Sequence, residues 1–260
     1  MIIKIYRIAA TLVSVFAFAF GFVTTGRADA QTPVRNIVLV HGAFADGSSW
    51  LKVIPILQAK GFHVTAVQIP LSGLANDLAV VKRALAQQDG PTILVAHSWG
   101  GVVITEAGMD DKVVGLVYVA AFGLDAGESI NQLAKGAPVP PALAHLNVDA
   151  QGFGSIPTND FLKYFAQDLP EGEARALAAA QGPAFAGSFD DKPMHAAWKT
   201  KPSWYIVAKR DGTISPDAER FFAQRMHART TELDANHVTM LSQPGNVAAV
   251  ILDAAAKAIP

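Results

Sequence analysis

One serine in this sequence stands where a nucleophile would be expected. Ser98 follows an apolar run, Thr92 to Ala96, and precedes two glycines in the string AHSWGG. A strand that turns sharply into a helix can carry a serine at its apex only if small residues flank it two positions away, and Ala96 and Gly100 meet that requirement. The alternative is that Ser98 only caps a helix. We predict that Ser98 is a nucleophile on a strand–turn–helix motif, a nucleophile elbow.

The C-terminal third supplies an acid and a base in the order that such a serine requires, with the aspartate before the histidine. Asp211 comes just after the apolar run Trp204 to Ala208, and His237 just after the run Thr230 to Leu233. Open α/β sheets place their sites at the carboxyl ends of strands. We therefore predict His237 as the general base and Asp211 as the acid that orients it.

Other titratable residues compete for these roles. Asp125 follows an earlier predicted strand, and Asp234 lies close to His237 in the chain, too close to reach its ring from the proper side. His41 ends a strand before a glycine, which favours an ordering role in the loop over catalysis. The other histidines show no spacing typical of metal ligands, and no metal or cofactor is predicted; they are His63, His97, His145, His195 and His227. Of these, His195 could reach a pocket from the end of the inserted segment described below.

A second motif, in the string VLVHGAF, ends the first predicted strand. The glycine at Gly42 lets a backbone amide point outward. In hydrolases built around such an elbow, two N–H groups hold the oxyanion of the tetrahedral intermediate. One belongs to the residue after the nucleophile, here Trp99, and the other to this early loop, where Ala43 is the predicted donor.

Alternating patterns indicate the elements that must position these residues. Short β-branched runs are predicted strands, buried on both faces, at 37–40, 64–69, 92–96, 113–120, 204–208 and 230–233. Segments with helical spacing lie at 50–60, 74–88, 100–109, 216–227 and 247–259. Such alternation predicts the α/β class, with a mostly parallel central sheet and helices on both faces.

The segment 125–198 interrupts this alternation. It is rich in Pro, Gly and Ala, with short helical patterns at 160–168 and 172–181. Long irregular segments inside compact domains are uncommon unless they are functional, so we predict an inserted lid; the alternative is an ordinary surface excursion. Large apolar side chains expected to line a substrate pocket are Phe161, Phe165, Met194 and Trp198 in this segment, with Phe44 and Phe122 near the nucleophile.

The amino-acid composition excludes several classes of partner and of active site. A chain of 260 residues that is 51% hydrophobic can bury a large core, and its net charge of −1 gives no reason to expect a nucleic-acid partner. The absence of cysteine excludes a disulfide framework, a thiolate zinc site and a cysteine nucleophile. The chemistry must therefore use oxygen and nitrogen atoms.

The N-terminus predicts export. Lys4 and Arg7 precede the apolar run 8–23, and Ala28 and Ala30 stand at the two positions that a signal peptidase reads. We expect cleavage before Gln31, hence a signal peptide at 1–30, a mature domain at 31–260 that is periplasmic or secreted, and no stable membrane association. The alternative is a retained anchor, since the run is only slightly shorter than a spanning helix.

Together these motifs resemble the α/β-hydrolase superfamily, in particular the group of plant methyl-ester esterases, hydroxynitrile lyases and small bacterial hydrolases. The resemblance covers roughly residue 36 to the end. It is carried by HGAF with Trp50, AHSWGG, Ala120-Ala121-Phe122, WKTKPSWY, Asp211 with Ile214-Ser215-Pro216, and His237. It implies a helical cap over a mostly apolar pocket and cofactor-free cleavage of a small ester through an acyl-enzyme.

Two alternatives belong to other functional classes. The resemblance also allows a lyase that uses the triad for proton transfer, but in those relatives a lysine follows the catalytic histidine and a threonine replaces the early-loop glycine. This sequence has Val238 and Gly42 at those positions. A non-catalytic protein that holds a small ligand in the same pocket is the third possibility, although such proteins usually lose a triad member and all three are present here.

Overall fold

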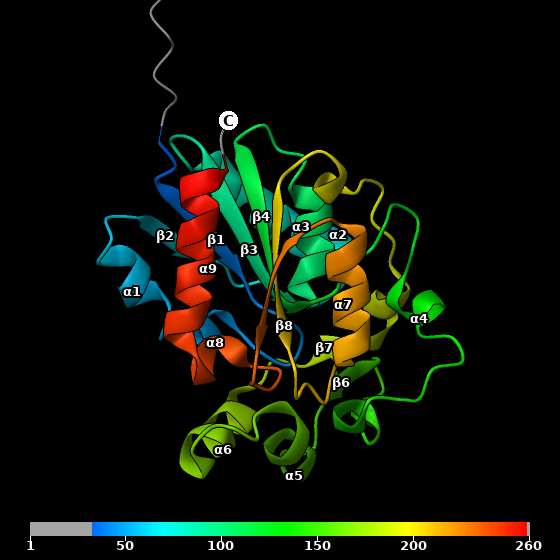
Figure 1. Ribbon diagram of the computed structural model, residues 1–260. Coiled ribbons are helices and arrows are strands. Elements are labelled where there is room, and N and C mark those ends of the chain that lie inside the picture. Colours follow the sequence, from blue (N-terminus) through cyan, green and yellow to red (C-terminus); the bar gives the residue numbers. More distant parts are fainter. Residues whose placement is uncertain (1–32, 259–260) are drawn as a thin grey trace, which may run out of the picture. The chain divides into compact units, whose positions relative to one another are not determined.

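A six-stranded parallel sheet forms the centre of the fold (Figure 1). The computed structural model describes residues 33–258. In spatial order the strands are β2 (His63–Ala66), β1 (Asn36–Val40), β3 (Thr92–Ser98), β4 (Val113–Ala121), β8 (Ser203–Ala208) and β9 (Arg229–Leu233), and all neighbours pair in parallel. Every residue of β1, β3, β4 and β8 is buried, as expected for strands covered on both faces. The predicted strands are thus confirmed, although β2 ends at Ala66. The prediction that all six are buried on both faces is wrong for β2 and β9, which end the strand order and are mostly exposed or half-buried.

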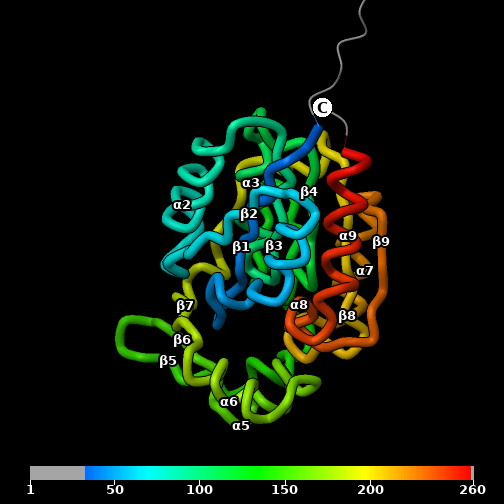
Figure 2. Tube along the Cα trace, turned by 90° about the vertical axis from the view of Figure 1, so that its left-hand side faces the viewer, coloured from blue at the N-terminus to red at the C-terminus, as the bar shows by residue number. Residues whose placement is uncertain are grey.

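Helices cover both faces of the sheet, which confirms the predicted fold class. On one face α9 (Pro244–Lys257) packs against β3, β4 and β8 and contacts α1 (Ile54–Gln58). On the other, α2 (Leu74–Ala86) and α3 (Gly100–Ala107) lie together (Figure 2). The predicted helix at 50–60 is divided: η1 (Gly47–Trp50), a 3-10 turn, comes before α1.

The helix that follows the Asp211 loop shows how the sequence sets local structure. Ser215 caps α7 (Pro216–Arg225), and its side chain accepts the N–H of Ala218. Pro216 occupies the first helical position, where no intrahelical N–H bond is needed. The cap therefore starts α7 directly after the loop that carries Asp211, and α7 then packs against β8.

The predicted insert is a chain of short elements rather than two helices alone. In order they are α4 (Ile130–Leu133), η2 (Pro141–Leu143), β5 (Asn147–Val148), β6 (Phe153–Ser155), α5 (Thr158–Asp160), the π-helical η3 (Phe161–Phe165), α6 (Glu171–Ala180), β7 (Ala184–Phe185), η4 (Ala186–Asp190) and η5 (Ala197–Lys199). Strands β5, β6 and β7 form a small antiparallel sheet that the sequence patterns did not predict. Figure 1 shows α5 and α6 beyond the end of the central sheet where the strands terminate. The role of the segment 125–198 as a lid stays a prediction.

The predicted signal peptide lies outside residues 33–258. The signal segment 1–30 and its cleavage site belong to residues that the structure does not describe, so both stay predictions. Within residues 33–258, no helix is long and apolar enough to cross a membrane.

Candidate active site

Ser98 lies at a strained turn between β3 and α3. Its φ of +51° is left-handed, a conformation that costs a non-glycine residue about 1 to 3 kcal/mol and that clusters at active sites. The turn depends on the glycine that follows: a Cβ at Gly100 would lie 2.7 Å from the His41 carbonyl oxygen. Close passage of the first strand against this turn therefore requires a glycine at Gly100, and the elbow predicted from the sequence is formed.

The three predicted side chains meet in one hydrogen-bonded chain. His237 Nε2 lies 2.9 Å from Ser98 Oγ, and His237 Nδ1 lies 2.6 Å from Asp211 Oδ2. The side chains of His237 and Asp211 are 0% exposed. When Nδ1–H donates to Asp211, Nε2 is left to accept the hydroxyl proton of Ser98, which is the arrangement that activates a serine.

The backbone around Asp211 fixes its carboxylate. Oδ1 accepts the N–H groups of Thr213 at 2.6 Å and Ile214 at 2.9 Å, so Oδ2 faces the histidine. The competing acids are engaged elsewhere. Asp125 pairs with Lys199 at 2.6 Å, and Asp234 with Arg210 at 3.2 Å. Neither takes the place of Asp211 beside His237.

Two other histidines order the loops around the triad. His41 Nδ1 contacts the Gly42 carbonyl at 2.9 Å, and Nε2 accepts the Ile69 N–H at 3.0 Å, which fits the ordering role predicted for it. His97 Nε2 lies 3.0 Å from the His237 carbonyl oxygen, and the two rings are 4.5 Å apart. Burial lowers the pKa of His41 and lowers that of His97 well below its usual range, which favours the neutral form of both rings.

The predicted oxyanion donors border the same space as Ser98. The backbone N–H groups of Ala43 and Trp99 donate to no other group within the described chain, and both residues line a cavity with Ser98. A Cβ at Gly42 would lie 2.6 Å from Ser98 Cβ, so this loop can approach the nucleophile only with glycine there. Two unpaired N–H groups beside a nucleophile can stabilise a developing negative charge.

An anchor for Trp99 was not predicted from the sequence. Its indole N–H donates to Asp77 Oδ2 at 2.7 Å, and Asp77 Oδ1 accepts the Leu71 N–H at 2.8 Å. Burial raises the pKa of Asp77 from its usual value. Asp77 therefore fixes the side chain of the residue that follows the nucleophile.

The cavity at Ser98 has a volume of about 380 Å³. It is lined by the predicted Phe44 and Phe122. Apolar side chains that were not predicted from the sequence also line it, among them Ile130, Leu133, Val139, Leu143, Leu146, Phe189, Ile214 and Phe222. Most of these come from the irregular segment after β4 and from α7. No Asp, Glu, Lys, Arg or His among the described residues lines this cavity.

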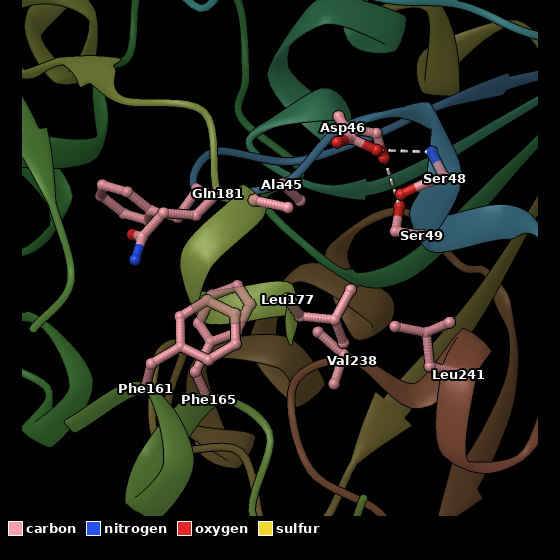
Figure 3. Close-up of a pocket in the computed structure, with 12 residues that line it drawn as sticks. Ala45, Asp46, Ser48, Ser49, Phe161, Phe165, Leu177, Gln181, Val238 and Leu241 are labelled. Atoms are coloured by element: carbon pink, nitrogen blue, oxygen red, sulfur yellow. Dashed lines mark hydrogen bonds between the residues drawn. The ribbon is translucent and has the colours of Figure 1, made fainter. Parts of the chain in front are cut away.

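The predicted lid residues take other positions. Phe161 and Phe165 line a second, much smaller cavity of about 20 Å³ with Leu177, Val238 and Leu241 (Figure 3). The Phe165 ring also packs edge-on against His237, with centroids 4.9 Å apart.

Met194 and Trp198 lie outside both cavities, contrary to the prediction. Met194 is 79% exposed, and the indole N–H of Trp198 donates to the Leu124 carbonyl at 2.8 Å. His195 is also turned away from the cavity, because its Nδ1 contacts Glu106 at 2.9 Å. Within the described residues, no group of three or more His, Asp or Glu side chains could hold a metal ion.

A curated plant relative resembles the chain along most of its length, and a bacterial one along about a third of it. Methylesterase 2 of Arabidopsis thaliana is 26% identical over 246 residues, which cover 81% of this chain and 92% of that protein. A pyrethroid hydrolase of Sphingobium wenxiniae is 35% identical over a shorter stretch of 101 residues, 34% of this chain and 36% of that protein.

Solved structures share the architecture. A crystal structure of a pyrethroid hydrolase superposes with a TM-score of 0.77 at 25% identity, covering 86% of this chain and 98% of that chain. Polyneuridine aldehyde esterase, at 20% identity, superposes with a TM-score of 0.72 over 84% of this chain and 98% of its own, and so shows the fold. The model of the "Alpha/beta hydrolase family" matches residues 37–250, and the chain belongs to that family.

Proposed function

We propose that the protein is a serine esterase that cleaves an apolar ester through an acyl-enzyme on Ser98. The observation that carries the proposal is the continuous contact from Ser98 through His237 to Asp211 at the wall of a cavity large enough for a small substrate. Pockets of roughly 300 to 1,000 Å³ are typical of small-molecule sites. Relatives named methylesterase and pyrethroid hydrolase support ester chemistry.

The first half of the proposed reaction forms the acyl-enzyme. His237 Nε2 takes the hydroxyl proton while Ser98 Oγ bonds to the ester carbonyl carbon and the carbonyl electron pair moves to oxygen. The N–H groups of Ala43 and Trp99 donate to this oxyanion. Collapse breaks the bond to the alcohol oxygen, which receives the proton from His237.

The second half of the proposed reaction hydrolyses the acyl-enzyme and regenerates the free enzyme. Water gives a proton to His237 Nε2 as its oxygen bonds to the acyl carbon. The second tetrahedral intermediate uses the same two N–H donors. Its collapse breaks the bond to Ser98 Oγ, which takes the proton back from His237 Nε2, and releases the carboxylic acid. Asp211 keeps the imidazole in the required tautomer throughout.

The cavity lining favours an apolar substrate. Its polar side chains are few, Asn131, Thr213 and Ser215 besides Ser98, and none carries charge. A charged acyl or alcohol group would lose its hydration there without gaining a partner. We therefore assign the cavity to an uncharged, apolar part of the ester.

The lyase alternative gains no support from this site. Val238 follows His237, is buried and is apolar, and no cationic side chain in the described chain lines the cavity to meet a cyanide leaving group. Gly42 also lacks the hydroxyl that the lyase relatives carry.

Turnover and labelling together test the proposal. A series of p-nitrophenyl esters with acyl chains from C2 to C12 should be hydrolysed by the mature protein, and a serine-directed phosphonate should label it stoichiometrically at Ser98. A protein that binds esters without turnover and resists the phosphonate would instead be a binding protein.

Export is proposed on the sequence alone. The charged, apolar and small-residue regions of 1–30 support removal of that segment before Gln31. The exported fraction should then contain a chain whose mass begins at Gln31.

A further inference from the structure

A carboxyl group that the proposed mechanism does not use lies beside the triad. Glu219 belongs to α7 and is 0% exposed. Its Oε2 accepts the N–H of Ala208, the last residue of β8, at 2.9 Å. Its Oε1 has no hydrogen-bond partner within the described residues. A fully buried acid with one oxygen unpaired needs an explanation, because burying a carboxylate is costly unless it is well paired.

The same strand end joins Glu219 to Asp211. Ala208 donates its N–H to Glu219, and its carbonyl accepts the Asp211 N–H at 3.2 Å. The negative charge of Asp211 also acts on Glu219. Glu219 is therefore linked through Ala208 to Asp211, the residue that orients His237.

The groups around Glu219 decide which carboxyl carries the negative charge. Asp211 receives two backbone N–H groups and the ring N–H of His237, whereas Glu219 receives one N–H. Besides Asp211, the neighbours of Glu219 are the neutral phenol of Tyr205 on β8 and the guanidinium of Arg220 on α7, which is engaged with Glu232 and Asp217.

Burial and the charge of Asp211 together raise the pKa of Glu219 well above its usual range, and the attraction of Arg220 is too weak to offset them. Two adjacent buried carboxyl groups hold one proton more readily than none, because two like charges in a poorly solvated site repel each other.

We propose that Glu219 is a positioning residue, a neutral carboxylic acid that holds the Ala208 N–H with one oxygen and supports the Asp211 carboxylate with its proton. The single negative charge of the pair then stays on Asp211, next to His237. Ionisation of Glu219 at alkaline pH places a second charge behind Asp211 and disturbs its contact with the histidine.

The location of the proton is tested by folding, independently of any esterase activity. A carboxyl that is neutral when folded but ionised when unfolded weakens folding as pH rises above the usual glutamate pKa. Glu219→Gln keeps the shape without needing a proton. Urea unfolding gives the folding equilibrium constant of each protein at each pH. The ratio of the constant of Glu219→Gln to that of wild type should rise by about tenfold or more between pH 4 and pH 8.

A matched control is Glu106→Gln, a partly buried acid whose carboxylate accepts the N–H groups of Met194 and His195. It should show no gain that grows with pH. If Glu219→Gln also shows no such gain, Glu219 is ionised in the folded protein and the proposal is overturned.

The effect on the triad rests on the proposed function and is tested by kinetics. Glu219→Leu, which removes the proton donor, should lower kcat about tenfold or more with little change in KM. Glu219→Gln, which restores a donor, should recover most of that loss. Wild type should show a decline in kcat/KM at alkaline pH as Glu219 ionises, and Glu219→Gln should lack it. A role limited to packing or to holding Ala208 predicts no change in the alkaline pH profile, and an unchanged profile in Glu219→Gln would overturn the positioning role.

The unfolding experiment and the kinetic experiment can fail independently of each other. If wild type turns over no ester, the proposed function fails while the unfolding experiment still reports on the proton of Glu219. If turnover is normal and the pH profile of Glu219→Gln matches wild type, the positioning role fails and the esterase proposal stands.

Discussion

His237 Nδ1 lies 2.6 Å from Asp211 Oδ2, and both side chains are completely buried. In so dry an environment this short contact determines which ring nitrogen carries the proton. It therefore determines whether Nε2 can accept the proton of Ser98.

Replacing Asp211 with asparagine should disable the histidine without unfolding the site. The amide can offer its own N–H to Nδ1, which favours the wrong tautomer, so kcat should fall by a factor on the order of 10⁴. Asp125→Asn and Asp234→Asn are the matched controls, because their carboxylates pair with Lys199 and Arg210. Both should keep wild-type kcat within about threefold, since exposed ion pairs contribute little. A greater loss in either control would mean that the acid has been misassigned.

Gly42→Ala should damage catalysis more than binding. The added Cβ would lie 2.6 Å from Ser98 Cβ and 2.9 Å from His97 Nδ1, so the early loop must move away from the nucleophile. Losing the position of one oxyanion donor lowers kcat by about 10² to 10³. Gly245→Ala, on α9 with open space around it, is the control and should leave kcat unchanged. Equal activity in the two variants would argue against an oxyanion role for this loop.

Side chains of the large cavity should set the preferred ester size. Leu143→Ala and Phe189→Ala remove apolar volume from its wall. Each lost contact is worth about 1.5 to 3 kcal/mol, so the ratio of kcat/KM between long and short acyl chains should change by about tenfold or more. Met194→Ala is the control, since Met194 is exposed and does not line the cavity at Ser98. A larger change in the control than in both cavity variants would place specificity elsewhere.

Buried neutral histidines should make the protein sensitive to mild acid. Burial lowers the pKa of His41 and His97 in the folded state below the usual 6.5, so stability is complete above that pH and is lost as pH falls toward the folded-state values. Each such group removes up to about 1.4 kcal/mol of unfolding free energy per pH unit in that window.

Urea unfolding from pH 8 to pH 5 checks this dependence. His41→Gln should be less stable than wild type at pH 8 but should lose less stability on acidification. His227→Asn, at an exposed position, should keep the wild-type slope. The same slope in all three proteins would show that His41 does not contribute to acid sensitivity.

Chain order and strand ends were enough to predict the catalytic candidates. Ser98 ends β3, and Asp211 and His237 come shortly after β8 and β9. Because parallel strands bring their carboxyl ends to one edge, the meeting of the three residues follows from topology. The centre of the sheet was also predictable, because β1, β3, β4 and β8 are buried along their whole length and appear as nearly continuous apolar runs.

The cavity wall was not predictable in the same way. Residues 125–198 have no sustained period, so nothing in the local pattern shows which apolar side chains face the nucleophile. Phe165 was expected in the substrate pocket but packs on the ring of His237, and Met194 points to solvent. Glu219 shares the helical spacing of Phe222 and Ala223, which form the buried face of α7, but nothing in the local pattern shows that its carboxyl accepts the Ala208 N–H.

The most direct test is the hydrolysis of a short p-nitrophenyl ester by Ser98→Ala. Because this side chain lies at a turn and contributes little packing, the variant should unfold at the same urea concentration as wild type. Its kcat should fall by at least about 10⁴, and phosphonate labelling should disappear. Turnover comparable to wild type in the folded variant would contradict the assignment of Ser98 as the nucleophile, and with it the proposed acyl-enzyme mechanism.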